Sequence, residues 1–136
     1  MTERVLRFNT PADDVDTVQD FLEALWADHD DVAPLDRMAF ETAIAELAAN
    51  VIQHADSGSG VTCVLTVDID DGGLRATLKD TAEAGGFSLR TFEMPDALAE
   101  EGRGIALIQA LVDDLAYDRV DGVNRWTISR GRSIAG

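Results

Sequence analysis

Apolar residues alternate with mostly polar ones from position 61 to 69, and this alternation constrains the fold of the chain most strongly. Its apolar members are Val61, Cys63, Leu65, Val67 and Ile69. A period of two predicts a β-strand with one buried face. Asp71-Gly72-Gly73 then predicts a hairpin turn, and a second strand continues the apolar face with Leu74, Ala76 and Leu78.

Asp80 falls on the apolar face of the second strand, two residues after Leu78. A carboxylate at that place must either reach solvent at the end of the strand or be hydrogen-bonded. Asp80 is therefore a candidate functional residue.

The segment from about Leu35 to Ala55 predicts a long helix with one packing face. Its apolar stripe consists of Phe40, Ile44, Leu47 and Val51. Glu46, Asn50 and His54 recur at four-residue steps, so at about 100° per residue they form one inclined polar row. An amide oxygen suits Mg²⁺, and a carboxylate one turn away can orient or deprotonate a hydroxyl. A solvated helix face would give the same row, so the row alone does not identify a site.

The rest of the chain completes the predicted elements. Periodicity predicts a strand over 5–8, a helix over 13–27, a helix that Gly102-Arg103-Gly104 opens and that reaches Val112, and a closing hairpin over 115–120 and 125–129 around Asp121-Gly122. Trp126 and Ile128 mark the buried face of that hairpin. Residues 81–101 have weak periodicity and predict a long connection.

The predicted order is strand, helix, helix, two strands, helix, two strands. With so few helices, all of them should cover one face of a mixed, mostly antiparallel sheet. The predicted fold class is therefore α/β (α+β), a two-layer sandwich. We expect one domain over residues 1–136, because 46% of the residues are hydrophobic and can form one core.

The charge balance excludes several functions. The net charge is −15, and Lys79 is the only lysine among the eleven cationic residues. Phosphate backbones and anionic membranes would repel such a surface, so we expect no nucleic-acid and no membrane partner, and a basic protein fits better. The single cysteine, Cys63, allows no internal disulfide. Without a signal segment or a membrane span, the expected location is cytoplasmic.

Gly102 and Gly104 lie at the predicted start of a helix, where free amide groups attract phosphate, and Arg103 adds a cation. Helix-entry geometry explains the glycines about as well. Asn50, Asp80 and this helix start, in that order, nevertheless describe an ATP site. The site is not a P-loop, because no G-x-x-x-x-G-K-[ST] pattern occurs.

These segments together resemble the anti-sigma-factor serine/threonine kinases of bacterial partner-switching systems, which belong to the histidine-kinase-like ATPase superfamily with its Bergerat-type fold. Three segments give the resemblance, namely Glu46-Leu47-Ala48-Ala49-Asn50 through His54-Ala55, Asp80, and Gly102-Arg103-Gly104-Ile105-Ala106-Leu107. The resemblance covers almost the whole chain.

The resemblance implies ATP and Mg²⁺ as cofactors. Asn50 would coordinate Mg²⁺ on the triphosphate, and Glu46 would act as the base toward a serine hydroxyl. Asp80 would accept a hydrogen bond from the adenine amino group. The amides of Gly102–Gly104, with the charge of Arg103, would hold phosphates. His54 would support the site or serve only as a structural partner.

One motif departs from the family pattern. The family typically follows its adenine-binding acid with Asp-x-Gly-x-Gly, whereas this chain has Ala82 and Ala84 at the glycine positions. A Cβ there penalises positive φ and narrows the space for a ligand. Either the later glycines, beginning with Gly85, take over, or nucleotide binding is weak or lost.

The resemblance also implies partners. The protein would bind a sigma factor and phosphorylate an anti-sigma-factor antagonist protein, and it would form a homodimer through its first strand and first helix. The segment from Phe87 to Glu101 would be the ATP lid. The alternative is a catalytically inactive protein-binding module of the same fold. A metal hydrolase that uses Glu46, Asn50 and His54 is disfavoured, because asparagine is a poor transition-metal ligand.

Overall fold

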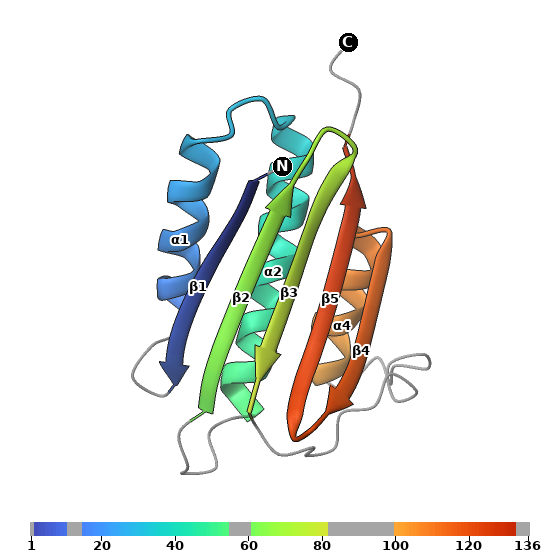
Figure 1. Ribbon diagram of the computed structural model, residues 1–136. Helices are drawn as coiled ribbons and strands as arrows, with labels where there is room; N and C mark the ends of the chain where they lie inside the picture. Colours follow the sequence, from blue (N-terminus) through green and yellow to red (C-terminus); the bar gives the residue numbers. More distant parts are fainter. Residues whose placement is uncertain (1, 11–14, 55–60, 82–99, 133–136) are drawn as a thin grey trace.

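The computed structural model describes residues 2–10, 15–54, 61–81 and 100–132 (Figure 1). Of residues 2, 10, 52–54 and 100–105 it describes the backbone but not the side chains. Gly85 and most of the predicted lid therefore lie outside the described residues. No helix in the described ranges is long and apolar enough to cross a membrane.

The elements follow the predicted order. They are β1 (Thr2–Thr10), α1 (Val15–Ala27), α2 (Pro34–His54), β2 (Val61–Ile69), β3 (Gly73–Asp80), α4 (Glu100–Leu111), β4 (Asp114–Val120) and β5 (Val123–Gly131). β1 is longer than the predicted strand over 5–8, because it pairs with β2 along its whole length. The strand therefore includes polar residues at both ends, which pair through their backbone and gave no periodic hydrophobic signal in the sequence.

The start of α4 differs from the prediction. Gly102-Arg103-Gly104 lie inside the helix, which already begins at Glu100, instead of preceding it. Two glutamates at the beginning explain the earlier start, because negative charge is favourable at a helix N-terminus. Gly102 is the third and Gly104 the fifth residue of the helix as described.

The five strands form one sheet in the order β1-β2-β3-β5-β4. The described pairs are all antiparallel, so the sheet is not mixed as expected. The crossover through α4 explains the difference. The crossover places β4 at the edge of the sheet, and β5 then returns between β4 and β3, antiparallel to both. If β4 had paired with β3 directly, that pair would have been parallel.

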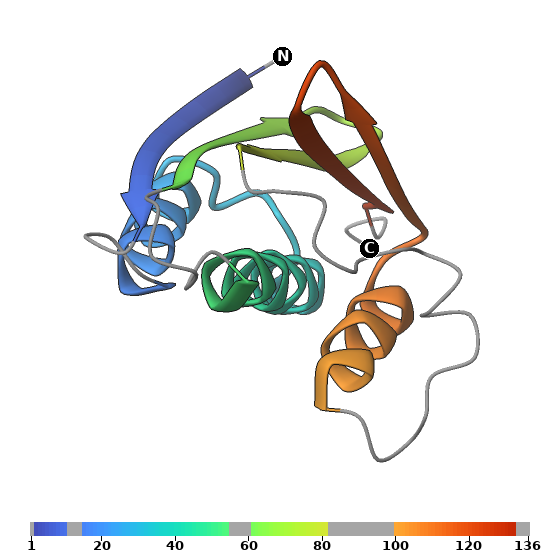
Figure 2. The same ribbon diagram turned by 90° about the horizontal axis from the view of Figure 1, so that it is seen from below.

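The helices α1, α2 and α4 lie on the same face of the sheet (Figure 2), as predicted. The core fills the space between the two layers. The predicted stripe of α2 is buried, with Phe40 0%, Ile44 1%, Leu47 1% and Val51 6% exposed, and the sheet contributes Cys63, Leu65, Leu78, Trp126 and Ile128. Burial of each large apolar side chain contributes about 1.5–3 kcal/mol, which fixes α2 against the sheet.

Four segments meet at one end of this sandwich. They are the end of β3, the last turns of α2, the start of α4 and the turn between β4 and β5 (Figure 1). α2 contacts both α4 and β3. The predicted site residues that fall within the described ranges are on three of these four segments.

Candidate functional site

Asn50 is a buried amide near the end of α2. It is 6% exposed, and its Nδ2 has no hydrogen-bond partner among the residues that the structure describes. Leaving such a group unpaired costs about 1–3 kcal/mol. A polar ligand group at this end of the molecule would remove that cost, so Asn50 has the property expected of a ligand-binding side chain.

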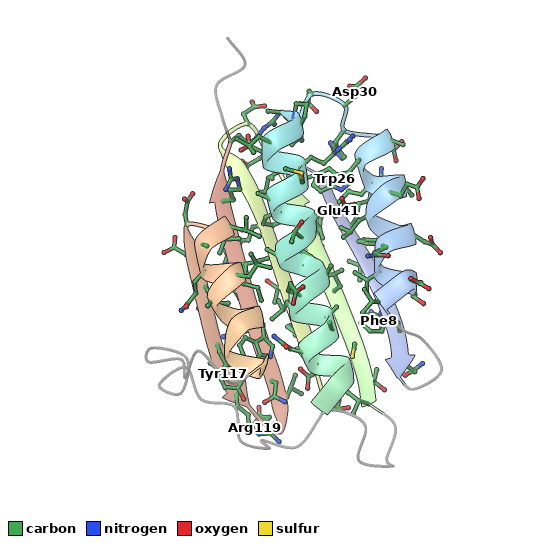
Figure 3. All side chains as sticks on the ribbon, turned by 180° about the vertical axis from the view of Figure 1, so that it is seen from behind. Phe8, Trp26, Asp30, Glu41, Tyr117 and Arg119 are labelled. Atoms are coloured by element: carbon green, nitrogen blue, oxygen red, sulfur yellow. The ribbon has the colours of Figure 1, made fainter. Side chains whose placement is uncertain are left out.

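Glu46 lies one turn before Asn50 and is half-buried. It lines a groove on the outer side of the helical layer together with Gln19 and Glu23 of α1 and Glu41, Thr42 and Ala45 of α2. Figure 3 shows Glu41 on the side of α2 that faces away from the sheet. His54 ends α2, and the role of its side chain stays a prediction.

Asp80 is 2% exposed although it is the last residue of β3. Of the two predicted alternatives, solvent exposure and hydrogen bonding, the structure has the second. Nδ2 of Asn124 donates a hydrogen bond of 2.9 Å to Oδ1 of Asp80. The two residues are register partners on β3 and β5.

Asn124 also contacts two further polar residues that the sequence analysis missed. Its Oδ1 accepts hydrogen bonds from the Tyr117 hydroxyl at 2.5 Å and from Nη1 of Arg119 at 2.7 Å. Figure 3 shows Tyr117 and Arg119 at the end of the molecule where α2 ends and α4 begins. A polar network on β3, β5 and β4 therefore borders the candidate site.

The sequence contained a signal for this network. The turn residues Asp121 and Gly122 have φ values of 53° and 79°, the signature of a two-residue type I′ hairpin. That turn places Arg119 opposite Asn124. Since Trp126 faces the core, the period of two requires Asn124 to face it as well.

Burial and charge keep the neighbouring acidic groups protonated. Burial, followed by the negative charge of Asp80, raises the pKa of Cys63 from 9.0 to about 12. Burial is also the largest cause of the raised pKa of Tyr117; Arg119 opposes the shift and Asp80 adds to it. Tyr117 is thus a stable hydrogen-bond donor, and Cys63 is an unreactive core thiol.

The backbone of α4 begins at the same end of the molecule as Asp80. Gly102, Arg103 and Gly104 follow Glu100 and Glu101 in its first described turns, close to a helix N-terminus, which attracts anions. Their contribution to phosphate binding stays a prediction.

Two other features do not belong to this site. A hollow lined by Thr66, Thr77, Lys79, Arg125 and Thr127, among others, lies on the sheet face that the helices leave uncovered. Within the described ranges, no group of three or more His, Cys, Asp or Glu side chains could hold a metal ion.

The residues present suit a magnesium nucleotide. Asp80 is a buried acceptor for a base. The unpaired Nδ2 of Asn50 can donate to a phosphate oxygen, the Oδ1 of the same amide is the kind of oxygen that ligates Mg²⁺, and a helix N-terminus attracts phosphate. The family model of the histidine kinase-like ATPase domain matches residues 8–130, which includes all of these groups. In a comparison with curated proteins, none matches the chain.

Proposed function

Because the chain belongs to the histidine kinase-like ATPase domain family, we propose that it is an ATP-dependent serine/threonine protein kinase acting as an anti-sigma factor. Family membership implies nucleotide binding. The proposal adds a phosphoryl transfer to an antagonist protein and the reversible binding of a sigma factor.

The buried, unpaired amide of Asn50 is the observation that most supports an active nucleotide site. A protein that had no use for this group would gain stability by replacing it. In the proposal, the unpaired Nδ2 of Asn50 donates to a phosphate oxygen, and its Oδ1 would hold Mg²⁺, which would neutralise charge on the triphosphate. Asp80 receives the adenine amino group, and the start of α4 receives phosphates.

The position of Glu46 supports a protein substrate. Its side chain lines a surface groove between α1 and α2, which a hydroxyl-bearing segment of another protein can reach. In the proposal, Glu46 accepts the proton of that hydroxyl as the oxygen attacks the γ-phosphoryl group.

Charge and topology support the proposed partners. An acidic chain of net charge −15 suits basic protein surfaces. For the homodimer, β1 is an edge strand of the sheet, and its Val5 is 46% exposed. An exposed edge strand is a ready surface for a second copy.

Transfer of radiolabelled γ-phosphate from Mg-ATP to a candidate antagonist protein tests the proposal. Glu46→Gln should lower the transfer rate by roughly 100- to 10,000-fold, the usual contribution of a general base, while ATP affinity changes little. Glu41→Gln is the matched control, because Glu41 lines the same groove. Equal labelling by both variants would remove Glu46 from the chemistry.

A binding module without phosphotransfer is the second candidate. Two observations favour it, namely Ala82 and Ala84 in place of the family glycines and an Asp80 that already accepts a hydrogen bond from Asn124. Such a module would bind its sigma factor equally well with and without ATP. An affinity that changes with ATP would contradict it.

A further inference from the structure

Asn124 is the buried centre of the hydrogen-bond network that ends on Asp80. Every hydrogen bond of this network is donated in the same sense, from Arg119 and Tyr117 to Asn124 and from Asn124 to Asp80. Arg119 has no acceptor atom, so its hydrogen bond to Asn124 fixes the carboxamide oxygen toward Arg119 and Tyr117. The amide nitrogen must then face Asp80, to which it donates at 2.9 Å. The orientation of the Asn124 amide therefore follows from its neighbours.

This direction favours the form of Asp80 in which both oxygens accept. An amide nitrogen can only donate, so Oδ1 of Asp80 must accept, and a hydrogen bond donated to a carboxyl group stabilises its ionised form, whose second oxygen is also an acceptor. A carboxylate of this kind pairs with the 6-amino group of a purine. It leaves a purine 6-carbonyl without a partner, and an unpaired buried polar group costs affinity.

We propose that Asn124, held by Arg119, is a positioning residue that determines the base specificity of the nucleotide site. It selects purines with a 6-amino group over purines with a 6-carbonyl group by fixing which atoms residue 80 presents to the base. This inference rests on the proposed nucleotide site at Asp80, and it adds a control of that residue from the β4–β5 hairpin.

A polarity inversion tests the inference. Calorimetric titrations of the full chain with Mg-ATP and Mg-ITP, which differ at the purine 6-position, give the ATP preference. The native protein should prefer ATP by at least about tenfold. In Asp80→Asn, the nitrogen of Asn124 pairs with the new amide oxygen, so the new amide nitrogen faces the base and ITP should be preferred.

Adding Asn124→Asp to Asp80→Asn should then restore the preference for ATP over ITP. In Asp80→Asn/Asn124→Asp, the carboxylate at 124 pairs with the amide nitrogen at 80, the amide oxygen faces the base, and ATP should again be preferred. Asn9→Asp in the Asp80→Asn background is the matched control, because Asn9 is an exposed residue of β1. It adds the same charge and should leave the ITP preference unchanged.

Arg119→Met gives a second test at an exposed residue that does not threaten folding. It should lower the ATP preference at least about threefold by releasing the amide of Asn124. If the native protein prefers ATP but the preference follows neither residue 124 nor Arg119, only this inference is overturned. If the native protein binds neither nucleotide, the proposed function is overturned with it.

Discussion

Arg130 of β5 donates a hydrogen bond from Nε to Oδ1 of Asp36 at 3.1 Å, at the end of the sandwich opposite Asp80. Its Nη1 also donates to the carbonyl of Leu111 at 2.6 Å. Asp36 is in the first turn of α2, and Leu111 is the last residue of α4. One guanidinium thus holds the far ends of the two helices whose other ends form the candidate site.

Arg130→Met should destabilise the protein by about 3 kcal/mol, because it takes the cation away from a buried carboxylate; Asp36 is 1% exposed. Urea unfolding followed by circular dichroism measures the change. Arg125→Met is the control, since both side chains of the Arg125–Asp118 pair are 48% exposed and such pairs contribute little. Equal unfolding midpoints for the two variants would contradict a structural role for Arg130.

Stability should fall as the pH rises from 9 to 12 because of Cys63. Burial and then Asp80 raise the pKa of Cys63 from 9.0 to about 12, so in this window the folded protein keeps a proton that the unfolded chain loses. The stabilisation is complete below pH 9 and is lost by up to about 1.4 kcal/mol per pH unit above it.

Cys63→Ala should remove that loss. Urea midpoints measured between pH 8 and 10.5 should fall more steeply for the native protein than for the variant. The pKa of Tyr117 is also raised, so the stability of the native protein and of the variant should both still fall somewhat with pH near pH 10. Parallel profiles would mean that the thiol does not titrate as described.

Gly122→Ala should destabilise the protein by about 1 kcal/mol, because Gly122 has a φ of +79° that a side chain disfavours. The same change should weaken nucleotide binding, since the turn aligns Arg119 with Asn124. Gly72→Ala is the matched control: its φ is not positive, and its added Cβ would meet only a side-chain atom at 3.4 Å. Thermal unfolding of the two variants gives the comparison.

Asn50→Leu should leave the fold as stable as before or more stable, by up to about 1–3 kcal/mol, because it removes a buried amide nitrogen without a described partner. Asn124→Leu should have the opposite effect, since the amide of Asn124 is hydrogen-bonded at both ends. Urea unfolding distinguishes the two. A large destabilisation by Asn50→Leu would show that Asn50 serves the fold.

Local patterns were sufficient to predict most of the fold. The alternation of β2 predicted that Cys63 and Leu65 are buried, and the helical period predicted the packing face of α2. Pairing partners were not predictable in this way. β5 lies between β3 and β4 because of the route of the crossover, which no local pattern encodes.

The candidate site was predictable where one element supplies its own signal. Asp80 interrupts an apolar strand face, and the structure has it buried and hydrogen-bonded as one of two predicted alternatives. Asn124 was missed although it continues the buried face of Trp126, as Asp80 continues that of Leu78, and Arg119 was missed because it is an ordinary polar residue on its own strand. Their importance arises only from the register that brings Asn124 beside Asp80.

Calorimetric titration with ATP, in Mg²⁺ and then in EDTA, tests most directly whether the ends of α2, β3 and α4 form one magnesium-nucleotide site. The native protein should bind ATP more tightly with Mg²⁺, and Asn50→Ala should lose that difference. Binding that is indifferent to Mg²⁺ and to Asn50, or no binding at all, would contradict the account.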